Sequence, residues 1–175
     1  HVCKAAIGNK KVTVHGVTGE GDVAHVRSHS NFNIDFEVID ADASLDLCLL
    51  KTSSKVKALP LARSSKELER FDTIYTIGAP SGNFPILIKT NFSGFLERSV
   101  LSEGMAAKMV QGAGNEYLFI SDIMHPGHSG SPVFNDKFEV VGLIFAVMRK
   151  QETSMTFGSI AIPVDDIKKL LKRNN

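Results

Sequence analysis

The most constraining feature of the sequence is a short turn between two β-forming runs. Residues 126–132 read Pro-Gly-His-Ser-Gly-Ser-Pro, and β-branched and aromatic residues dominate the flanking runs 117–120 and 138–145. Two glycines beside one serine let the backbone take dihedral angles that other residues avoid, while the hydroxyl of Ser129 stays accessible. The pattern predicts a tight turn between strands that presents Ser129 as a nucleophile.

Other interpretations of this turn exist. An ordinary glycine-serine turn ending at a proline is the simplest, because turns of this composition are common. An esterase elbow, Gly-x-Ser-x-Gly, must lead directly into a helix, and Ser131, Pro132 and the β-forming residues after them do not start one. The turn resembles the Gly-x-Ser-Gly-Gly-Pro motif of the chymotrypsin-fold, trypsin-like serine proteases, departing from it at Ser131, where that family usually has glycine.

The amides of Gly127 and Ser129 can point into one small space and bind a developing oxyanion. A second segment, Asp46-Leu-Cys-Leu-Leu-Lys51, is similar to the Asp-Ile-Ala-Leu-Leu-Lys segment that carries the triad aspartate in the same family. A continuous apolar strand follows Asp46, so Asp46 would be drawn inward while Asp40 and Asp42 can stay in solvent. The resemblance implies that Asp46 orients the catalytic histidine.

Two histidines compete for the role of general base. His1-Val2 resembles the end of the Thr-Ala-Ala-His segment that carries the catalytic histidine, and His1 precedes Asp46 by a longer interval than His15 does. His15 has a spacing to Asp46 close to that of bacterial HtrA/Deg proteases, but its surroundings resemble the strand after the catalytic histidine. We therefore expect His1 to be the base. The order histidine, aspartate, serine matches the chymotrypsin type.

The resemblance covers nearly the whole chain and is closest to HtrA/Deg protease domains. Segments 71–80 and 155–163 resemble the Val-x-Ala-Ile-Gly-x-Pro-x-Gly and Gly-x-x-Phe-Ala-Ile-Pro runs of that group. It implies an all-β fold of two six-stranded antiparallel Greek-key barrels with a C-terminal α-helix. The expected domains are a first barrel over 1–58, a crossover over 59–70, a second barrel over 71–163 and a helix over 164–175. The first strands of the first barrel are expected to precede His1.

The expected strands follow runs of β-forming residues between glycine- and serine-rich turns. The expected C-terminal helix has acidic residues early and basic ones late, with apolar positions on one face. We expect this helix to dock on the protein rather than on a membrane. The expected strands are 11–14, 22–27, 34–39, 71–80, 86–97, 107–111, 117–121, 138–148 and 155–163.

Composition narrows the function classes. The 175 residues carry a net charge of +1 with both signs mixed, which disfavours nucleic acid as a partner. No apolar run approaches the roughly 20 residues of a membrane-spanning helix, and nothing at the start resembles a signal peptide. His25 and His29 would lie roughly 13 Å apart on a strand, too far to share a metal ion. Cys3 and Cys48 can pair, but we expect two free thiols.

The expected specificity pocket lies beside the nucleophile. Ile123 falls at the base of the pocket by the family spacing, which favours an apolar residue before the cleaved bond. Asp122 is the alternative base, and it would favour lysine or arginine. A viral polyprotein protease of this fold that selects glutamate or glutamine would have a histidine in the pocket wall, where this chain has isoleucine. The remaining pocket residues are Ile144, Phe145, Ala146 and Gly158.

The resemblance implies a serine endopeptidase acting on proteins or peptides without a metal or cofactor. The competing class is a binding or scaffold module that keeps the fold without the activity. His128 stands where trypsin-like zymogens have an aspartate that pairs with a new N-terminus, and a histidine cannot supply that carboxylate at neutral pH. No trypsin-type zymogen switch is therefore expected. Substrate identity, compartment and oligomeric state stay open, although HtrA relatives commonly form trimers.

Overall fold

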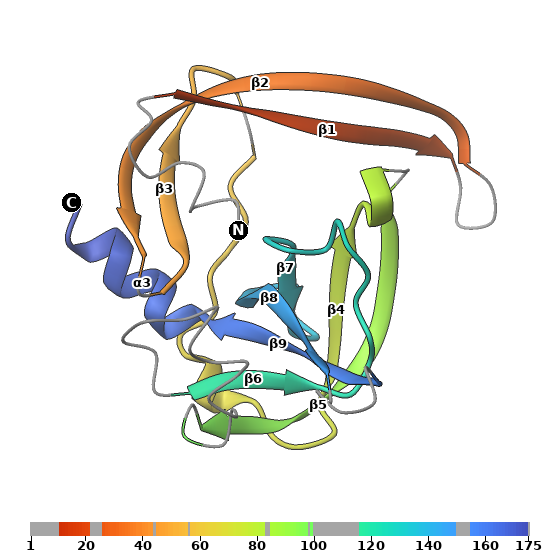
Figure 1. The fold of residues 1–175 in the computed structure, drawn as a ribbon, viewed down its shortest axis with the longest axis vertical. Helices are drawn as coiled ribbons and strands as arrows, with labels where there is room; N and C mark the ends of the chain where they lie inside the picture. The colour runs from red at the N-terminus through yellow and green to blue at the C-terminus, as the bar shows by residue number, and fades with distance from the viewer. Residues whose placement is uncertain are drawn as a thin grey trace.

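The computed structural model describes residues 11–21, 26–43, 45–55, 57–82, 85–97, 99, 116–149 and 155–174. Figure 1 shows a long curved sheet above a compact barrel, with one helix beside both. The sheet is antiparallel and has the order β1-β2-β3. Its strands are β1 (Lys11–Gly21), β2 (Val26–Asp42) and β3 (Leu47–Lys51).

The first sheet differs from the expected series of short strands. β2 continues through the polar run 28–33, where a break was predicted, so that part of the prediction is wrong. The reason is backbone pairing: β1 follows β2 from Lys11 opposite Glu37 to Gly21 opposite Val26, and this ladder keeps the polar run extended. The expected strand 22–27 lies partly outside the described residues.

The second unit is a closed antiparallel barrel with the order β4-β5-β6-β9-β8-β7. Closure leaves no unpaired edge, and the enclosed core contains Ile74, Phe92, Ile120 and Val133. These strands confirm the expected strands over most of their lengths, whereas 107–111 lies outside the described residues. The strands are β4 (Thr73–Gly78), β5 (Ile86–Glu97), β6 (Glu116–Ile120), β7 (Pro132–Phe134), β8 (Val140–Arg149) and β9 (Thr156–Pro163).

The expectation of two six-stranded barrels is therefore confirmed for the second unit only. Within the described residues the first unit contributes three strands and does not close. The expectation of free thiols is wrong for Cys48, which is disulfide-bonded. The only other cysteine of the sequence, Cys3, lies outside the described residues.

Helix α3 (Val164–Lys172) confirms the expected C-terminal helix. It packs against both units. Leu170 and Ile167 pack in a cluster with Leu47 of β3 and Phe145 of β8. Asp165, in the first helical turn, accepts hydrogen bonds from Ser64 and Ser65 of the segment between the units. Burial alone would raise the pKa of Asp165, but these hydrogen bonds outweigh it and lower the pKa.

The end of α3 also holds the first sheet through charge. Arg173 donates to the carboxylates of Asp40 and Asp42, at 2.6 and 2.7 Å, and Asn174 donates to Asp40 at 2.7 Å. The Arg173 guanidinium and the Asn174 amide lower the pKa of Asp40 to about 2. These two aspartates thus bind the helix, which the sequence did not indicate.

Candidate functional site

The predicted nucleophile lies in a turn between β6 and β7, and the turn is closed by its own backbone. The His128 amide donates to the His125 carbonyl oxygen at 3.1 Å, and the Ser131 amide donates to the His128 carbonyl oxygen at 2.8 Å. Ser129 is exposed between these two hydrogen bonds. A strand follows this turn and no helix does, as the protease-like motif predicts and an esterase elbow would not.

The turn is also tied to two other parts of the barrel. Ser81, just after β4, donates its amide to the Pro126 carbonyl oxygen at 2.8 Å. On the other side, Ile144 of β8 accepts from the Gly130 amide at 2.7 Å and donates to the Ser131 carbonyl oxygen at 2.9 Å. The backbone before Ser129 is therefore anchored to the segment after β4, and the backbone after it is anchored to β8.

The backbone conformation at two positions of the turn requires glycine. Gly127 has φ 104° and Gly130 has φ 86°, both in the left-handed region. A Cβ atom on Gly127 would also lie 2.2 Å from the Ala79 carbonyl oxygen, and that atom belongs to the backbone. Gly127 thus lets the turn approach the end of β4. Among the described residues, no backbone carbonyl accepts from the Gly127 or Ser129 amides.

The side chain of His128 lies on the opposite side of the turn from solvent. It is 1% exposed, and its Nδ1 donates to the His125 carbonyl oxygen at 3.1 Å. Its Nε2 is buried and has no hydrogen-bond partner in the part of the chain that the structure describes. The ring lies against Gly78 of β4, where an added Cβ atom would be 2.4 Å from His128 Cδ2.

The predicted triad is divided between the two units. Asp46 is half-buried in the turn before β3, where it has φ 51°, while Ser129 belongs to the barrel. His15, the rival base, lies on β1 opposite Asn33. His1 lies outside the described residues, so the triad as a whole is a proposal.

The predicted pocket residues lie on three segments, namely the connection between β6 and β7, strand β8 and strand β9. Ile123 is 45% exposed, Ile144 and Phe145 are buried, and Ala146 is half-buried. Gly158 was expected to leave space for substrate, but a Cβ atom there would lie 2.6 Å from Phe119 Cε2, so the Phe119 ring lies over it. No local sequence pattern predicts this contact, because β6 and β9 pair only in the folded chain.

Ser159 is a second residue that sequence reasoning missed. Its buried hydroxyl accepts from the Met124 amide and donates to the Asp122 carbonyl oxygen, both at 2.8 Å. It thereby fixes the backbone on both sides of Ile123. A small polar residue in the otherwise apolar run of β9 was the available signal.

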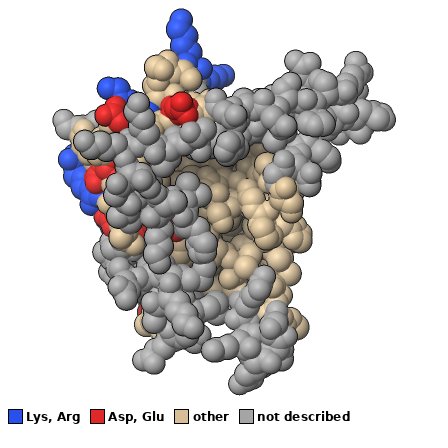
Figure 2. All heavy atoms as spheres, turned by 45° about the horizontal axis from the view of Figure 1, so that its top comes forward, with Lys and Arg blue, Asp and Glu red and all other residues tan. Residues whose placement is uncertain are grey.

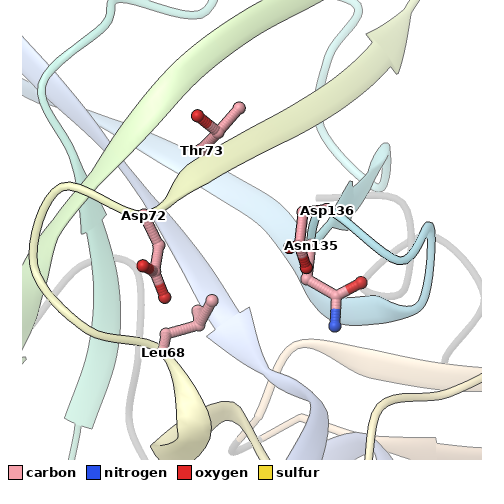
Figure 3. A pocket seen from close by; sticks show the side chains of 5 residues that line it. All are labelled: Leu68, Asp72, Thr73, Asn135 and Asp136. Carbon is pink, nitrogen blue, oxygen red and sulfur yellow. The ribbon is translucent and has the colours of Figure 1, made fainter.

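A separate pocket of about 190 Å³ lies on the barrel surface and contains none of the predicted site residues. Figure 3 shows its lining side chains, which come from the segment leading into β4 and from the β7–β8 turn. The carboxylate of Asp72 accepts from the Glu69 amide, and Asn135 is bonded within its own turn to Lys137 and Glu139. These polar groups therefore stabilise the two turns. The lining residues are Leu68, Asp72, Thr73, Asn135 and Asp136.

Charge and metal-ligand chemistry add little to the site. Figure 2 shows basic and acidic side chains side by side at one edge of the molecule, with uncharged side chains in the tan area beside them. In the described ranges, no three His, Cys, Asp or Glu side chains gather as metal ligands do. No helix among those ranges has the length and apolar character needed to cross a membrane.

Comparison with known proteins defines the class of this chain. The model of the trypsin-like peptidase domain matches residues 6–143, which is most of the sequence, and the chain belongs to that family. The serine protease HhoA of Synechocystis sp. is 30% identical over 156 residues, covering 88% of this chain and 37% of HhoA. A DegP-like periplasmic serine endoprotease of Ectopseudomonas mendocina is 30% identical over 159 residues, covering 88% of this chain and 30% of that protein.

A solved structure agrees with these relatives at the level of the fold. The HtrA-type protease AlgW with decapeptide superposes with a TM-score of 0.67 at 17% identity, covering 91% of this chain and 48% of the AlgW chain. The resemblance to HtrA/Deg proteases is thus confirmed. This chain spans about a third of the length of the curated relatives it matches.

Proposed function

We propose that this chain is the protease domain of a serine endopeptidase of the HtrA/DegP type. Ser129 attacks the peptide carbonyl, and His1 takes the hydroxyl proton and returns it to the leaving amine. The acyl group passes from Ser129 to water in a second step that uses the same base. Asp46 orients the imidazole and stabilises its charged form. The amides of Gly127 and Ser129 bind the oxyanion in both steps.

The anchored turn around Ser129 is the observation that carries this proposal. It is held by hydrogen bonds on both sides, it leaves Ser129 exposed, and no backbone carbonyl of the described residues accepts from the amides of Gly127 or Ser129. A preorganised turn of this kind costs no rearrangement when the oxyanion forms. A binding module that had lost activity would have no reason to keep all three features at one serine.

The proposed substrate is a protein or peptide with an apolar residue before the cleaved bond. Ile123 is exposed beside the turn, and Ser159 holds its backbone in place. A peptide library varied at that position should show the highest kcat/KM for apolar side chains. Preference for lysine or arginine would assign the role to Asp122 instead.

Ser129→Ala tests the proposal directly. The variant should lose peptide hydrolysis by at least about 10⁴-fold while its thermal unfolding stays close to that of the wild type. Ser54→Ala, an exposed serine after β3, is the matched control and should keep full activity. Unchanged cleavage by a pure Ser129→Ala sample would contradict the assignment.

A further inference from the structure

His128 is a buried polar side chain that the proposed reaction does not use. It is 1% exposed, although it lies directly before the exposed Ser129. A histidine is seldom enclosed this completely, and its polar atoms need partners when it is. Its presence behind the nucleophile therefore calls for a function.

Within the described residues, the hydrogen bonds of His128 fall in the turn that carries Ser129. The backbone amide and Nδ1 both donate to the His125 carbonyl oxygen, at 3.1 Å each, and the His128 carbonyl oxygen accepts from the Ser131 amide at 2.8 Å. Because a carbonyl oxygen can only accept, Nδ1 must carry a proton. One side chain thus reinforces the same turn that its backbone closes.

The ring also packs closely against β4. A Cβ atom at Gly78 would lie 2.4 Å from His128 Cδ2, 2.8 Å from His128 Cγ and 2.9 Å from Ser131 Oγ. Only glycine at residue 78 leaves room for the imidazole and for Ser131, the residue at which the motif departs from its relatives. Rotation of the ring away from Gly78 would break the Nδ1 contact with the His125 carbonyl oxygen, and the turn would lose that support.

We propose that His128 is a positioning residue for Ser129, acting through its Nδ1 contact with the His125 carbonyl oxygen and the packing of its ring against Gly78. The inference rests on the proposed function, because it concerns how the nucleophile is presented. A displacement of about 1 Å at a reacting group can reduce turnover about a hundredfold. The effect belongs to kcat, since His128 is enclosed and does not reach substrate.

The test compares two amides of equal polarity at residue 128. The side-chain nitrogen of His128→Asn can take the place of Nδ1, whereas that of His128→Gln is one bond further out. His128→Asn should keep kcat within about threefold of the wild type, and His128→Gln should lower kcat about 30- to 100-fold with KM changed less than about twofold. Ser65→Ala is the control: this buried hydroxyl binds Asp165 of α3, so its loss should lower stability without changing kcat.

A fluorophosphonate probe separates positioning from folding and from the proposed function itself. The amplitude of labelling counts folded molecules, and the rate of labelling reports how Ser129 is presented. Equal rates and equal kcat values for the Asn and Gln variants, whether high or low, would overturn the inference. A wild-type protein that the probe does not label would overturn the proposed function instead.

A second variant pair keeps the inference testable if His128→Gln folds poorly. Gly78→Ala should slow labelling at least about tenfold, because its methyl group meets the ring. In a His128→Ala background no ring is present, and the methyl group meets only the Ser131 hydroxyl, which can rotate away. Gly78→Ala should therefore add less than about a threefold further loss there. If Gly78→Ala lowered the labelling rate by the same factor in both backgrounds, the two residues would not act together. That result would overturn the inference.

Discussion

The two units of this protein keep their shapes by different means. The barrel of β4 to β9 closes on itself, so each of its strands has two partners and its apolar core is enclosed. In the described residues, the sheet of β1 to β3 stays open and owes its place to α3, which packs on β3 and binds Asp40 and Asp42. The barrel is stabilised from within, and the sheet is stabilised by docking.

This difference matters because the proposed active site uses both units. Ser129 and its anchors belong to the barrel, whereas Asp46 precedes the docked strand β3. Disturbing the barrel should therefore change the nucleophile directly. Disturbing the docking of the sheet should change activity through the carboxylate, while the barrel stays folded.

Asp46→Asn is expected to have the largest effect. The amide keeps the shape of the side chain but cannot stabilise a charged imidazole, so kcat should fall about 10⁴-fold. Peptide hydrolysis measured with circular dichroism on the same sample checks this. Asp35→Asn, an exposed carboxylate on β2, is the control and should keep full activity. Full activity of Asp46→Asn would show that the sheet contributes no carboxylate to the reaction.

Gly127→Ala should come next, and it acts in the barrel alone. The added methyl group meets the Ala79 carbonyl oxygen, and φ 104° is unfavourable for alanine, so the turn must shift. Loss of an aligned oxyanion donor should lower kcat about 10²- to 10³-fold. Kinetics with a short peptide ester and a peptide amide measure this loss, and wild-type rates on both would remove Gly127 from the oxyanion site.

Leu170→Ala tests the docking of the sheet. Leu170 of α3 is 4% exposed and packs in a cluster with residues of β3 and β8. Its truncation should therefore lower the free energy of unfolding by about 2–5 kcal/mol. Urea unfolding gives this value. Hydrogen exchange should show the loss of protection concentrated in β3 rather than in β4 and β5. Uniform loss in both units would contradict the difference drawn between them.

Arg173→Ala should have the smallest effect, because its ion pairs with Asp40 and Asp42 are partly exposed. The Asp40 pKa is lowered to about 2 in the folded chain, so the contribution of Asp40 is present above its ordinary value of 3.8. It is lost as the pH falls toward 2. The difference in Tm between wild type and variant should therefore shrink between pH 4 and pH 2, and a constant difference would assign it to packing.

The barrel was more predictable than the sheet for physical reasons. Its strands alternate or cluster β-forming residues between clear turns, and the expected 86–97 matches β5 at both ends. The polar run 28–33 lacks such a signal, because its extended form depends on pairing with β1. The Ser129 turn was also predictable, since glycines beside a serine indicate backbone angles that other residues avoid.

Contacts between distant segments could not be predicted in the same way. The Phe119 ring over Gly158, the Ser159 hydroxyl behind Ile123 and the enclosed imidazole of His128 each depend on strand neighbours that no local pattern specifies. The pairing of Asp40 with Arg173 spans most of the chain for the same reason. The sequence predicts which residue types form the site, and the fold decides what lies around them.

The most direct test of the central claim is the site at which a fluorophosphonate attaches to the purified protein. Mass spectrometry of the digested adduct should find one label per molecule, on Ser129, and Ser129→Ala should take up none. A label on a different residue, or equal labelling of Ser129→Ala, would contradict the account.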